Sequence, residues 1–418
     1  MEDYGKILVV AMIFFMILMI IEKIYGIYIK NDTMPLIDAI SSLYSGLSNA
    51  VKDVLKLSVS LVSYNYLVNK FSIITIESTT LVYIIAFISI DFYGYWIHRW
   101  SHQINFFWNK HAIHHSSEEF NLPCALRQSV SFFVNIFVFL LLPAALLGVP
   151  SKVIATIFPI HLFMQFWYHT KHIGKMGFLE KIIVTPSHHR VHHAINPIYL
   201  DKNHGQIFII WDKIFGTFQE ELDSEPPVFG ITRPANTWNP FVINYQHLYL
   251  LIHDAIRTTS WKDKIIIWFK PTGWRPLGFE EKYPVSKITD VYNFTKFKTN
   301  IHKYNYHYTI IQFILTLILC FHLFNNIALI GLVNIYVYGF FIFVMIFTAT
   351  ELMNNNKYTF IFSIIQLVYG ISIVYFLNGW FGNLPLIYGI FILIFLITSI
   401  ILSLKLLTHK KNNPAPQS

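Results

Sequence analysis

Three short clusters of histidine are the strongest sign of a chemical site in this chain. They read His98-Arg-Trp-Ser-His102, His111-Ala-Ile-His114-His115 and His188-His189-Arg-Val-His192-His193. Neutral imidazole is the commonest metal ligand in proteins. A single four-coordinate ion needs fewer imidazoles than these clusters offer. We therefore predict a centre that holds two metal ions.

The spacing inside each cluster also favours two ions. His98 and His102 stand four residues apart, so on a helix they share one face. In the second cluster we expect His111 and His114 to share a face, with His115 turned aside. The third cluster repeats this pattern in its last members, His189, His192 and His193. Neighbouring histidines cannot serve one ion equally well, but they can serve two adjacent ions.

Two more histidines join the candidates. His169 stands where the apolar stretch 151–168 ends, and His188 either binds a metal or supports a residue that does. The predicted metal ligands are thus His98, His102, His111, His114, His115, His169, His188, His189, His192 and His193. Imidazole suits iron, zinc and copper alike, so spacing leaves the metal open. A bound imidazole usually donates its other N–H to a nearby group, for which the candidate carboxylates are Asp91, Glu118, Glu119, Asp201 and Asp212.

The elements that must position these clusters are membrane helices. The chain of 418 residues is 54% hydrophobic and 13% charged, whereas soluble domains carry about 25% charged residues. Because a spanning segment must satisfy every backbone polar group internally, we predict an all-α, multi-spanning membrane protein. Apolar runs lie near 7–28, 80–97, 130–148, 151–168, 308–325, 328–349, 359–377 and 386–407, with a weaker one near 54–67. The two cysteines, Cys124 and Cys320, exclude a disulfide framework or an iron–sulfur site.

The order of these runs predicts that the clusters meet. Two polar blocks, 98–129 and 170–305, hold the histidines, and the apolar pair 130–148 and 151–168 joins them through the turn Gly148-Val149-Pro150. Two crossings return the chain to the side it left, so both blocks face one compartment. The second block and the end of the chain are rich in Lys and Arg, which predicts that this side is cytoplasmic. The net charge of +8 then reflects membrane orientation, and no nucleic-acid partner is expected.

We divide the chain by these patterns into four parts. Residues 1–79 are predicted to be N-terminal anchor helices, 80–305 the histidine-box catalytic domain and 306–410 a set of C-terminal membrane helices. Residues 411–418, Lys-Asn-Asn-Pro-Ala-Pro-Gln-Ser, are expected to be a disordered tail. An endoplasmic reticulum membrane and a bacterial inner membrane would give the same pattern.

The clusters and their flanks resemble a known family. The three boxes match those of the fatty acid hydroxylase/sterol desaturase superfamily of membrane di-iron oxygenases. The runs His114-His115-Ser-Ser-Glu-Glu-Phe-Asn121 and Ile210-Trp-Asp-Lys-Ile-Phe-Gly-Thr-Phe218 are similar to those of alkylglycerol monooxygenases. The resemblance implies two iron ions, O2 as oxidant and tetrahydrobiopterin as a possible reductant. It also implies hydroxylation of the ether-bearing carbon of an alkylglycerol-type lipid, followed by release of a fatty aldehyde and a glycerol product.

Two departures from that family mark candidate catalytic positions. Gln103 stands where the nearest relatives commonly have Glu, and it cannot act as a carboxylate ligand or base. His204 stands where they commonly have Tyr, and it could add a ligand or a proton donor. The candidates to meet a lipid phosphate are Arg127, Arg190, Arg233 and Lys202, since Arg forms bidentate contacts with such groups.

Two rival functions stay open at this point. The first is a fatty acyl lipid or sterol hydroxylase or desaturase that uses the same di-iron site. The second is a metal transporter with a histidine-rich loop, although transporters place ionisable ligands at mid-membrane on broken helices. Here the clusters lie at the ends of apolar runs, which favours the enzyme.

Overall fold

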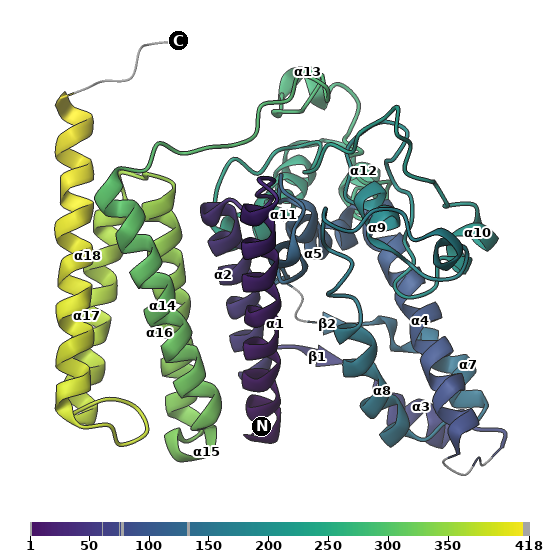
Figure 1. Ribbon diagram of the computed structural model, residues 1–418, viewed down its shortest axis with the longest axis horizontal. Coiled ribbons are helices and arrows are strands. Elements are labelled where there is room, and N and C mark those ends of the chain that lie inside the picture. Colours follow the sequence, from purple (N-terminus) through teal and green to yellow (C-terminus); the bar gives the residue numbers. More distant parts are fainter. Residues whose placement is uncertain (1, 61, 75, 77–78, 132–133, 413–418) are drawn as a thin grey trace.

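Six long apolar helices form the frame of the molecule (Figure 1). The computed structural model describes residues 2–60, 62–74, 76, 79–131 and 134–412. Within that part, the helices long and apolar enough to cross a membrane are α1 (Glu2–Tyr28), α4 (Thr80–Gln103), α14 (Lys303–Asn325), α16 (Leu332–Met353), α17 (Thr359–Leu377) and α18 (Leu386–Asn412). The prediction of an all-α, multi-pass membrane protein is confirmed.

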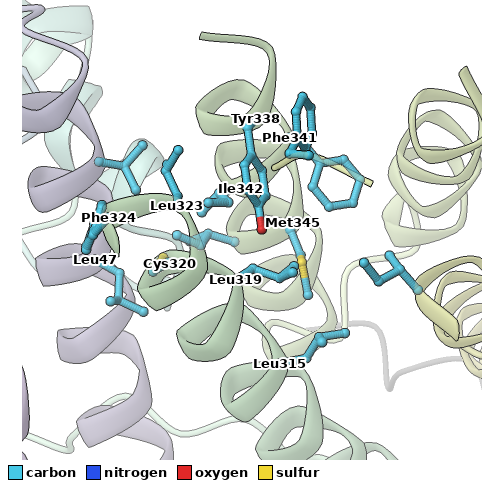
Figure 2. Packing of buried hydrophobic residues seen from close by; sticks show 14 of the residues in the cluster. Leu47, Leu315, Leu319, Cys320, Leu323, Phe324, Tyr338, Phe341, Ile342 and Met345 are labelled. Carbon is cyan, nitrogen blue, oxygen red and sulfur yellow. The ribbon is translucent and has the colours of Figure 1, made fainter. Parts of the chain in front are cut away.

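The four C-terminal spans form a bundle at one end of the molecule, and α4 stands at the other end, with α1 between them (Figure 1). Figure 2 shows Leu319 and Cys320 of α14 packed against Tyr338 and Met345 of α16. In lipid such helices are held together by close van der Waals packing rather than by the exclusion of water. The same core cluster includes Tyr44 and Leu47 of α2 (Leu36–Val54), so the bundle packs directly against the region that carries the histidines.

That region is built from shorter elements. Its helices are α2 (Leu36–Val54), α3 (Tyr64–Phe71), α5 (Asn105–His115), α6 (Leu122–Ala125), α7 (Leu142–Leu146), α8 (Ser151–Phe163), α9 (Pro186–His192), α10 (Ile210–Phe215), α11 (Pro240–Arg257), α12 (Trp261–Ile266) and α13 (Phe279–Lys282). Two 3-10 helices, η1 (Phe137–Leu141) and η2 (Gly177–Lys181), join them, and α15 (Ile327–Ile330) lies between α14 and α16. The only sheet in the described residues is the parallel pair β1 (Val59–Ser60) and β2 (Val134–Asn135).

Two expected spans are not spanning helices in the described residues, and neither is the weaker run 54–67, for which a span and an interfacial position were both left open. The run 130–148 contains η1 and α7, and the run 151–168 contains α8, so neither holds a helix of spanning length. The run 54–67 holds the end of α2, β1 and the start of α3. Proline explains where these helices begin, because Pro143 lies in the first turn of α7 and Pro150 directly precedes α8, while Pro159 lies inside α8 close to its end. The predicted pair of full crossings is therefore wrong, although the chain still returns to the clusters.

The helix α2 lies within the predicted anchor region 1–79, but none of the apolar runs had indicated it. Its buried face follows a three- and four-residue spacing, with Ile40, Tyr44, Leu47, Val51 and Val54 inside. Serines lie between these apolar residues, so the average hydropathy of the stretch is low. Only the three- and four-residue spacing of its apolar residues could have indicated a helix here. The predicted domain boundaries remain predictions. The predicted tail 411–418 falls mostly on 413–418, outside the described residues.

Candidate metal centre

The structure brings nine histidines together in two adjacent groups. The first group is His98, His102, His111, His115 and His192, and the second is His114, His169, His189 and His193. Within each group the ring nitrogens lie within 4.8 Å of one another. The first group takes its residues from α4, α5 and α9, and the second from α5, the end of α9 and the segment after α8 that carries His169. Each predicted box thus contributes to a candidate metal site.

Neighbouring histidines separate into different groups, as a two-metal centre requires. His115 belongs to the first group and His114 to the second, and the neighbours His192 and His193 divide in the same way. The expected partner of His111 was wrong, however, because the structure pairs it with His115 at 3.0 Å between Nε2 atoms and not with His114. Four residues turn a helix by about 400° and three by about 300°, so the four-residue pair is the better aligned.

Backbone carbonyls fix the orientation of several rings. The Nδ1–H groups of His98 and His192 donate to the carbonyls of His204 and Lys202, at 2.8 Å and 2.9 Å. His169 donates in the same way to the carbonyl of Gln165 at 3.1 Å. A carbonyl oxygen can only accept a hydrogen bond, so in each of these neutral rings Nδ1 carries the proton and Nε2 presents a lone pair. Such a partner is what a metal-bound imidazole normally has behind it.

One turn supplies most of the support for the first group. Besides the carbonyls of Lys202 and His204, it brings Asp201 Oδ1 to 3.4 Å from Nδ1 of His102. Asp201 and Asn203 adopt positive φ angles, which Asp and Asn tolerate better than most residues. The carboxylate of Asp212 holds the turn in place by accepting hydrogen bonds from the backbone N–H groups of His204 and Gly205, both at 2.7 Å. The sequence pointed to Asp201, but it gave no signal for the two carbonyls.

The distances between neighbouring Nε2 atoms match those between two ligands of one metal ion. Nε2 atoms of His98 and His111 are 2.9 Å apart, and those of His189 and His169 are 2.8 Å apart. Two ligand nitrogens that each lie about 2.0–2.1 Å from one ion would be about 3 Å apart at the right angle of octahedral coordination, and slightly farther apart in a tetrahedral site. His192 Nε2 is buried without a hydrogen-bond partner among the described residues. The donor set is entirely imidazole, which suits iron, zinc or copper and does not suit magnesium or calcium.

The other predicted carboxylates do not contact the groups directly. Asp91 Oδ1 lies 2.8 Å from His161 Nε2 and accepts from the backbone N–H of Ile207, also at 2.8 Å. Glu119 pairs with Lys296 at 2.6 Å. Glu118 accepts from the backbone N–H of Phe297. These carboxylates organise the loops around the centre.

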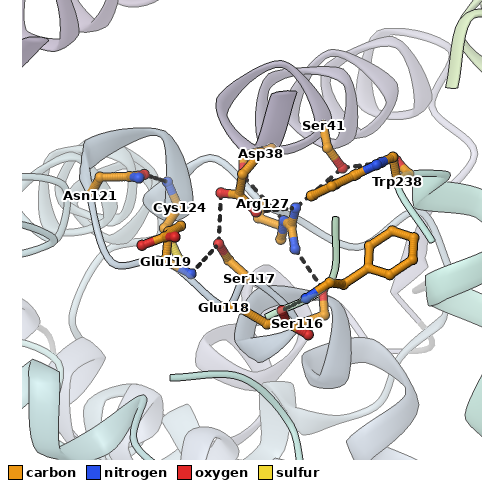
Figure 3. A network of polar contacts seen from close by, with 12 residues as sticks. Asp38, Ser41, Ser116, Ser117, Glu118, Glu119, Asn121, Cys124, Arg127 and Trp238 are labelled. Carbon is orange, nitrogen blue, oxygen red and sulfur yellow. Dashed lines mark hydrogen bonds and ion pairs between the residues drawn. The ribbon is translucent and has the colours of Figure 1, made fainter. Parts of the chain in front are cut away.

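A buried charge pair holds the turn that follows the second box (Figure 3). The guanidinium of Arg127 donates to Ser116 Oγ at 3.0 Å and to Asp38 of α2 at 3.3 Å. Ser117 Oγ donates to the other oxygen of Asp38 at 2.8 Å. Arg127 is therefore engaged inside the protein. Arg190 is likewise paired with both oxygens of Glu221, at 2.7 Å and 2.8 Å, so neither arginine is placed as the expected phosphate contact.

Three predicted residues lie outside both groups. His188 lies apart, because its Nδ1 accepts from the backbone N–H of Thr185 and caps α9. The side chain of Gln103 accepts from Arg99 at 3.4 Å. His204 is fully buried beside the first group, with its ring centroid 5.0 Å from that of His102, and neither of its nitrogens has a hydrogen-bond partner among the residues that the structure describes. Of the three, only His204 has free nitrogens next to the candidate ligands.

Burial keeps these imidazoles neutral, which predicts a pH dependence for the metal-free protein. Desolvation, helped by neighbouring histidines, holds the pKa of His115, His189 and His193 well below the ordinary value of 6.5. In the unfolded chain they titrate near that ordinary value, so below about pH 6.5 the unfolded state binds more protons. We expect the free energy of unfolding to decrease as the pH falls from 7.5 to 5.5, measured by thermal unfolding in detergent with a chelator present. An unfolding temperature that stays constant over this range would contradict the burial of neutral rings.

Comparison with known proteins gives a consistent result. A family model described as fatty acid hydroxylase matches residues 83–217, which include all three boxes. An alkylglycerol monooxygenase of Xenopus tropicalis is 36% identical over 288 residues, covering 68% of this chain and 64% of that protein. The human alkylglycerol monooxygenase is 36% identical over 310 residues, covering 73% of this chain and 68% of that protein. An ornithine lipid hydroxylase of Rhizobium tropici is 29% identical over 151 residues, covering 36% and 45% of the two chains. No solved structure gives a significant match.

Proposed function

The chain belongs to the alkylglycerol monooxygenase family, and from this premise we propose that it is a membrane monooxygenase acting on ether lipids. The reaction would hydroxylate the ether-bearing carbon of an alkylglycerol-type lipid. That carbon then carries two oxygens, and its C–O bond to glycerol breaks to leave a fatty aldehyde and a glycerol product. The alignment covers 64% of the Xenopus relative, so the activity of the whole relative is carried over as part of this proposal.

The observation that supports the proposal most is the pair of adjacent imidazole groups. The first group would hold one iron ion and the second group the other, through the ring nitrogens that converge within each group. Bound there, two iron ions would supply the redox chemistry by which O2 oxidises an unactivated carbon–hydrogen bond. The protein fixes the rings through the carbonyls of Lys202, His204 and Gln165. Fixed ligands and excluded water are what the protein contributes to such chemistry.

Two cavities suit the two ends of a lipid. An apolar groove of about 430 Å³ lies against α1 and is lined by Leu18, Ile21, Trp167 and Thr170, the last being the residue after His169. A second cavity of about 370 Å³ is lined by both acidic and basic side chains, including Glu118 and Lys296. The segment that follows the second box contributes to both cavities. We propose that the groove receives the alkyl chain and the charged cavity the polar head.

The proposal also covers the reductant and the two residues that differ from the family, His204 and Gln103. We infer that tetrahydrobiopterin is a possible electron donor, because the family relationship implies it. His204 is proposed as an additional ligand or hydrogen-bond donor at the first group, on the strength of its two buried, unpartnered nitrogens. Gln103 is proposed to act on the site through Arg99, to which it is hydrogen bonded.

The decisive experiment is a substrate comparison. Membranes containing the protein, supplied with an alkylglycerol, O2 and tetrahydrobiopterin, are expected to release a fatty aldehyde, detected by mass spectrometry. A variant carrying His114→Ala, in membranes matched for protein amount, provides the background. Product from an acyl lipid or a sterol, with no aldehyde from the alkylglycerol, would replace the ether-lipid proposal by the rival hydroxylase or desaturase.

A further inference from the structure

The outer face of α11 carries an exposed apolar stripe. Its residues follow three- and four-residue spacing, which places them on one helix face, and they are 38% to 69% exposed. They are Val242, Tyr245, Tyr249, Ile252 and Ile256. The opposite face is buried, with Ile243, Asn244, Leu251 and Asp254 directed into the protein. A helix that is apolar on its exposed side requires a cover other than water.

A second set of exposed apolar residues follows α11 in the chain. Trp261, Ile265 and Phe269 follow at four-residue spacing, on α12 and the turn after it, and they are 63% to 77% exposed. The backbone N–H of Phe269 still donates to the carbonyl of Ile266, so the helical path extends past the end of α12. We call these eight residues of α11 and α12 the apolar stripe.

Hydrogen bonds fix both ends of this segment to the ends of membrane helices. Before α11, the side chain of Asn239 donates to Glu351, near the end of α16, at 2.7 Å. After α12, the backbone N–H of Thr272 donates to the carbonyl of Gln103, the last residue of α4, at 3.2 Å. Figure 1 shows α11 and α12 at the end of the molecule where α4 ends. The stripe therefore lies where these spans leave the membrane.

The charges beside the stripe are mostly positive. Arg257, Lys262, Lys264 and Lys270 lie between the stripe residues 256 and 269 or next to them, and Asp263 is the one acidic residue in that interval. Lys264 Nζ sits 5.7 Å from the ring of Trp261. Aromatic side chains with nearby Lys and Arg are typical of helices that lie in the interface layer of a bilayer. Basic residues at that depth attract anionic headgroups.

We propose that α11 and α12 lie flat in the headgroup layer of the membrane that the protein spans, with the apolar stripe inserted and the basic residues on anionic lipid. The inner face of α11 packs against α5, which carries the second box. The same contact therefore holds both histidine groups close to headgroup depth. If the proposed function holds, the ether carbon of a lipid, which lies between head and tail, reaches the centre without leaving the bilayer.

The test measures the depth of single labels in the full-length protein. Cysteine is introduced by Ile256→Cys, Ile265→Cys or Phe269→Cys on the stripe, and by Glu280→Cys or Glu281→Cys at exposed positions off the stripe as matched controls. The natural Cys124 and Cys320 are buried and stay in place. Each variant is spin-labelled and reconstituted into phosphatidylcholine vesicles with or without phosphatidylserine. Collisions with O2, which is enriched in lipid, are compared with collisions with a water-soluble nickel chelate.

The expected result is a reversal between the two sets of labels. Stripe labels should collide several-fold more with O2 than with the nickel chelate, the control labels should do the opposite, and phosphatidylserine should deepen the stripe labels. Stripe labels as accessible to nickel as the controls would overturn the proposal. Dipolar broadening between stripe labels would also overturn it, because a second copy of the chain would then cover the stripe. No enzymatic activity is measured, so the result is independent of the proposed function.

Discussion

Replacing one histidine from either group should abolish turnover while the protein stays folded in the membrane. His192→Ala removes a ligand from the first group, and His114→Ala removes one from the second. Losing an outer-shell partner of a metal ligand typically costs 10- to 100-fold in affinity or activity, and losing the ligand itself should cost more. We expect the wild-type protein to carry about two iron ions, and each variant to lose at least the ion of its own group.

The measurement is metal analysis of purified protein beside the aldehyde assay. His307→Ala is the matched control, since His307 is exposed on α14 and far from both groups in sequence. That variant should keep its metal and its activity. One ion or none in the wild-type protein would refute the dinuclear centre. Full activity in either ligand variant would remove that residue from the ligand set.

Replacing Asp91 should have the largest effect on stability. This fully buried carboxylate on α4 accepts from the backbone N–H groups of Ile207 and Phe208 and from the indole of Trp211, and it also contacts His161. Asp91→Asn keeps the shape, but it offers one acceptor oxygen where several donors converge and removes the charge. We expect the free energy of unfolding to decrease by about 3–5 kcal/mol, which is the usual cost of removing one partner from a buried charged interaction.

The effect of Asp91→Asn should also reach the metal centre. The segment that Asp91 fixes follows directly on His204, whose carbonyl orients His98. Thermal unfolding in detergent measures the stability, and metal content measures the site. Asp53→Asn is the control, because that carboxylate lies near the surface of α2 and bonds only locally, so its effect should stay within about 0.5 kcal/mol. Equal unfolding temperatures for the two variants would show that Asp91 does not organise this loop.

Local patterns in the sequence were sufficient for several features. The spans around 80–97, 308–325 and 359–377 were recognisable because an apolar run of that length has one stable conformation in lipid. The boxes predicted a two-metal centre because the number of imidazoles exceeds the need of one ion. His169 was found from its position at the end of an apolar run. Each of these inferences depends on residues close together in the chain.

Other features depend on contacts between distant segments. The partner of Arg127 is Asp38, 89 residues away, and the carbonyl behind His98 belongs to His204, 106 residues away. Average hydropathy predicted full spans in 130–168, where prolines lie at the beginnings of the short helices. It also missed α2, because serines lie between the periodic apolar residues of that helix. The apolar stripe of α11 and α12 becomes visible only when its opposite face is known to be buried.

The number of imidazoles and their position at the ends of apolar runs are properties of the amino-acid order, and they indicate metal chemistry. The division of those imidazoles between two groups depends on how the helices pack. Helical periodicity fixes which side chains share a face, but the packing of α4, α5 and α9 decides which faces meet. This packing places His111 and His115 in the first group and His114 in the second. Each ring can bind an ion only in the space between the packed helices that its face reaches.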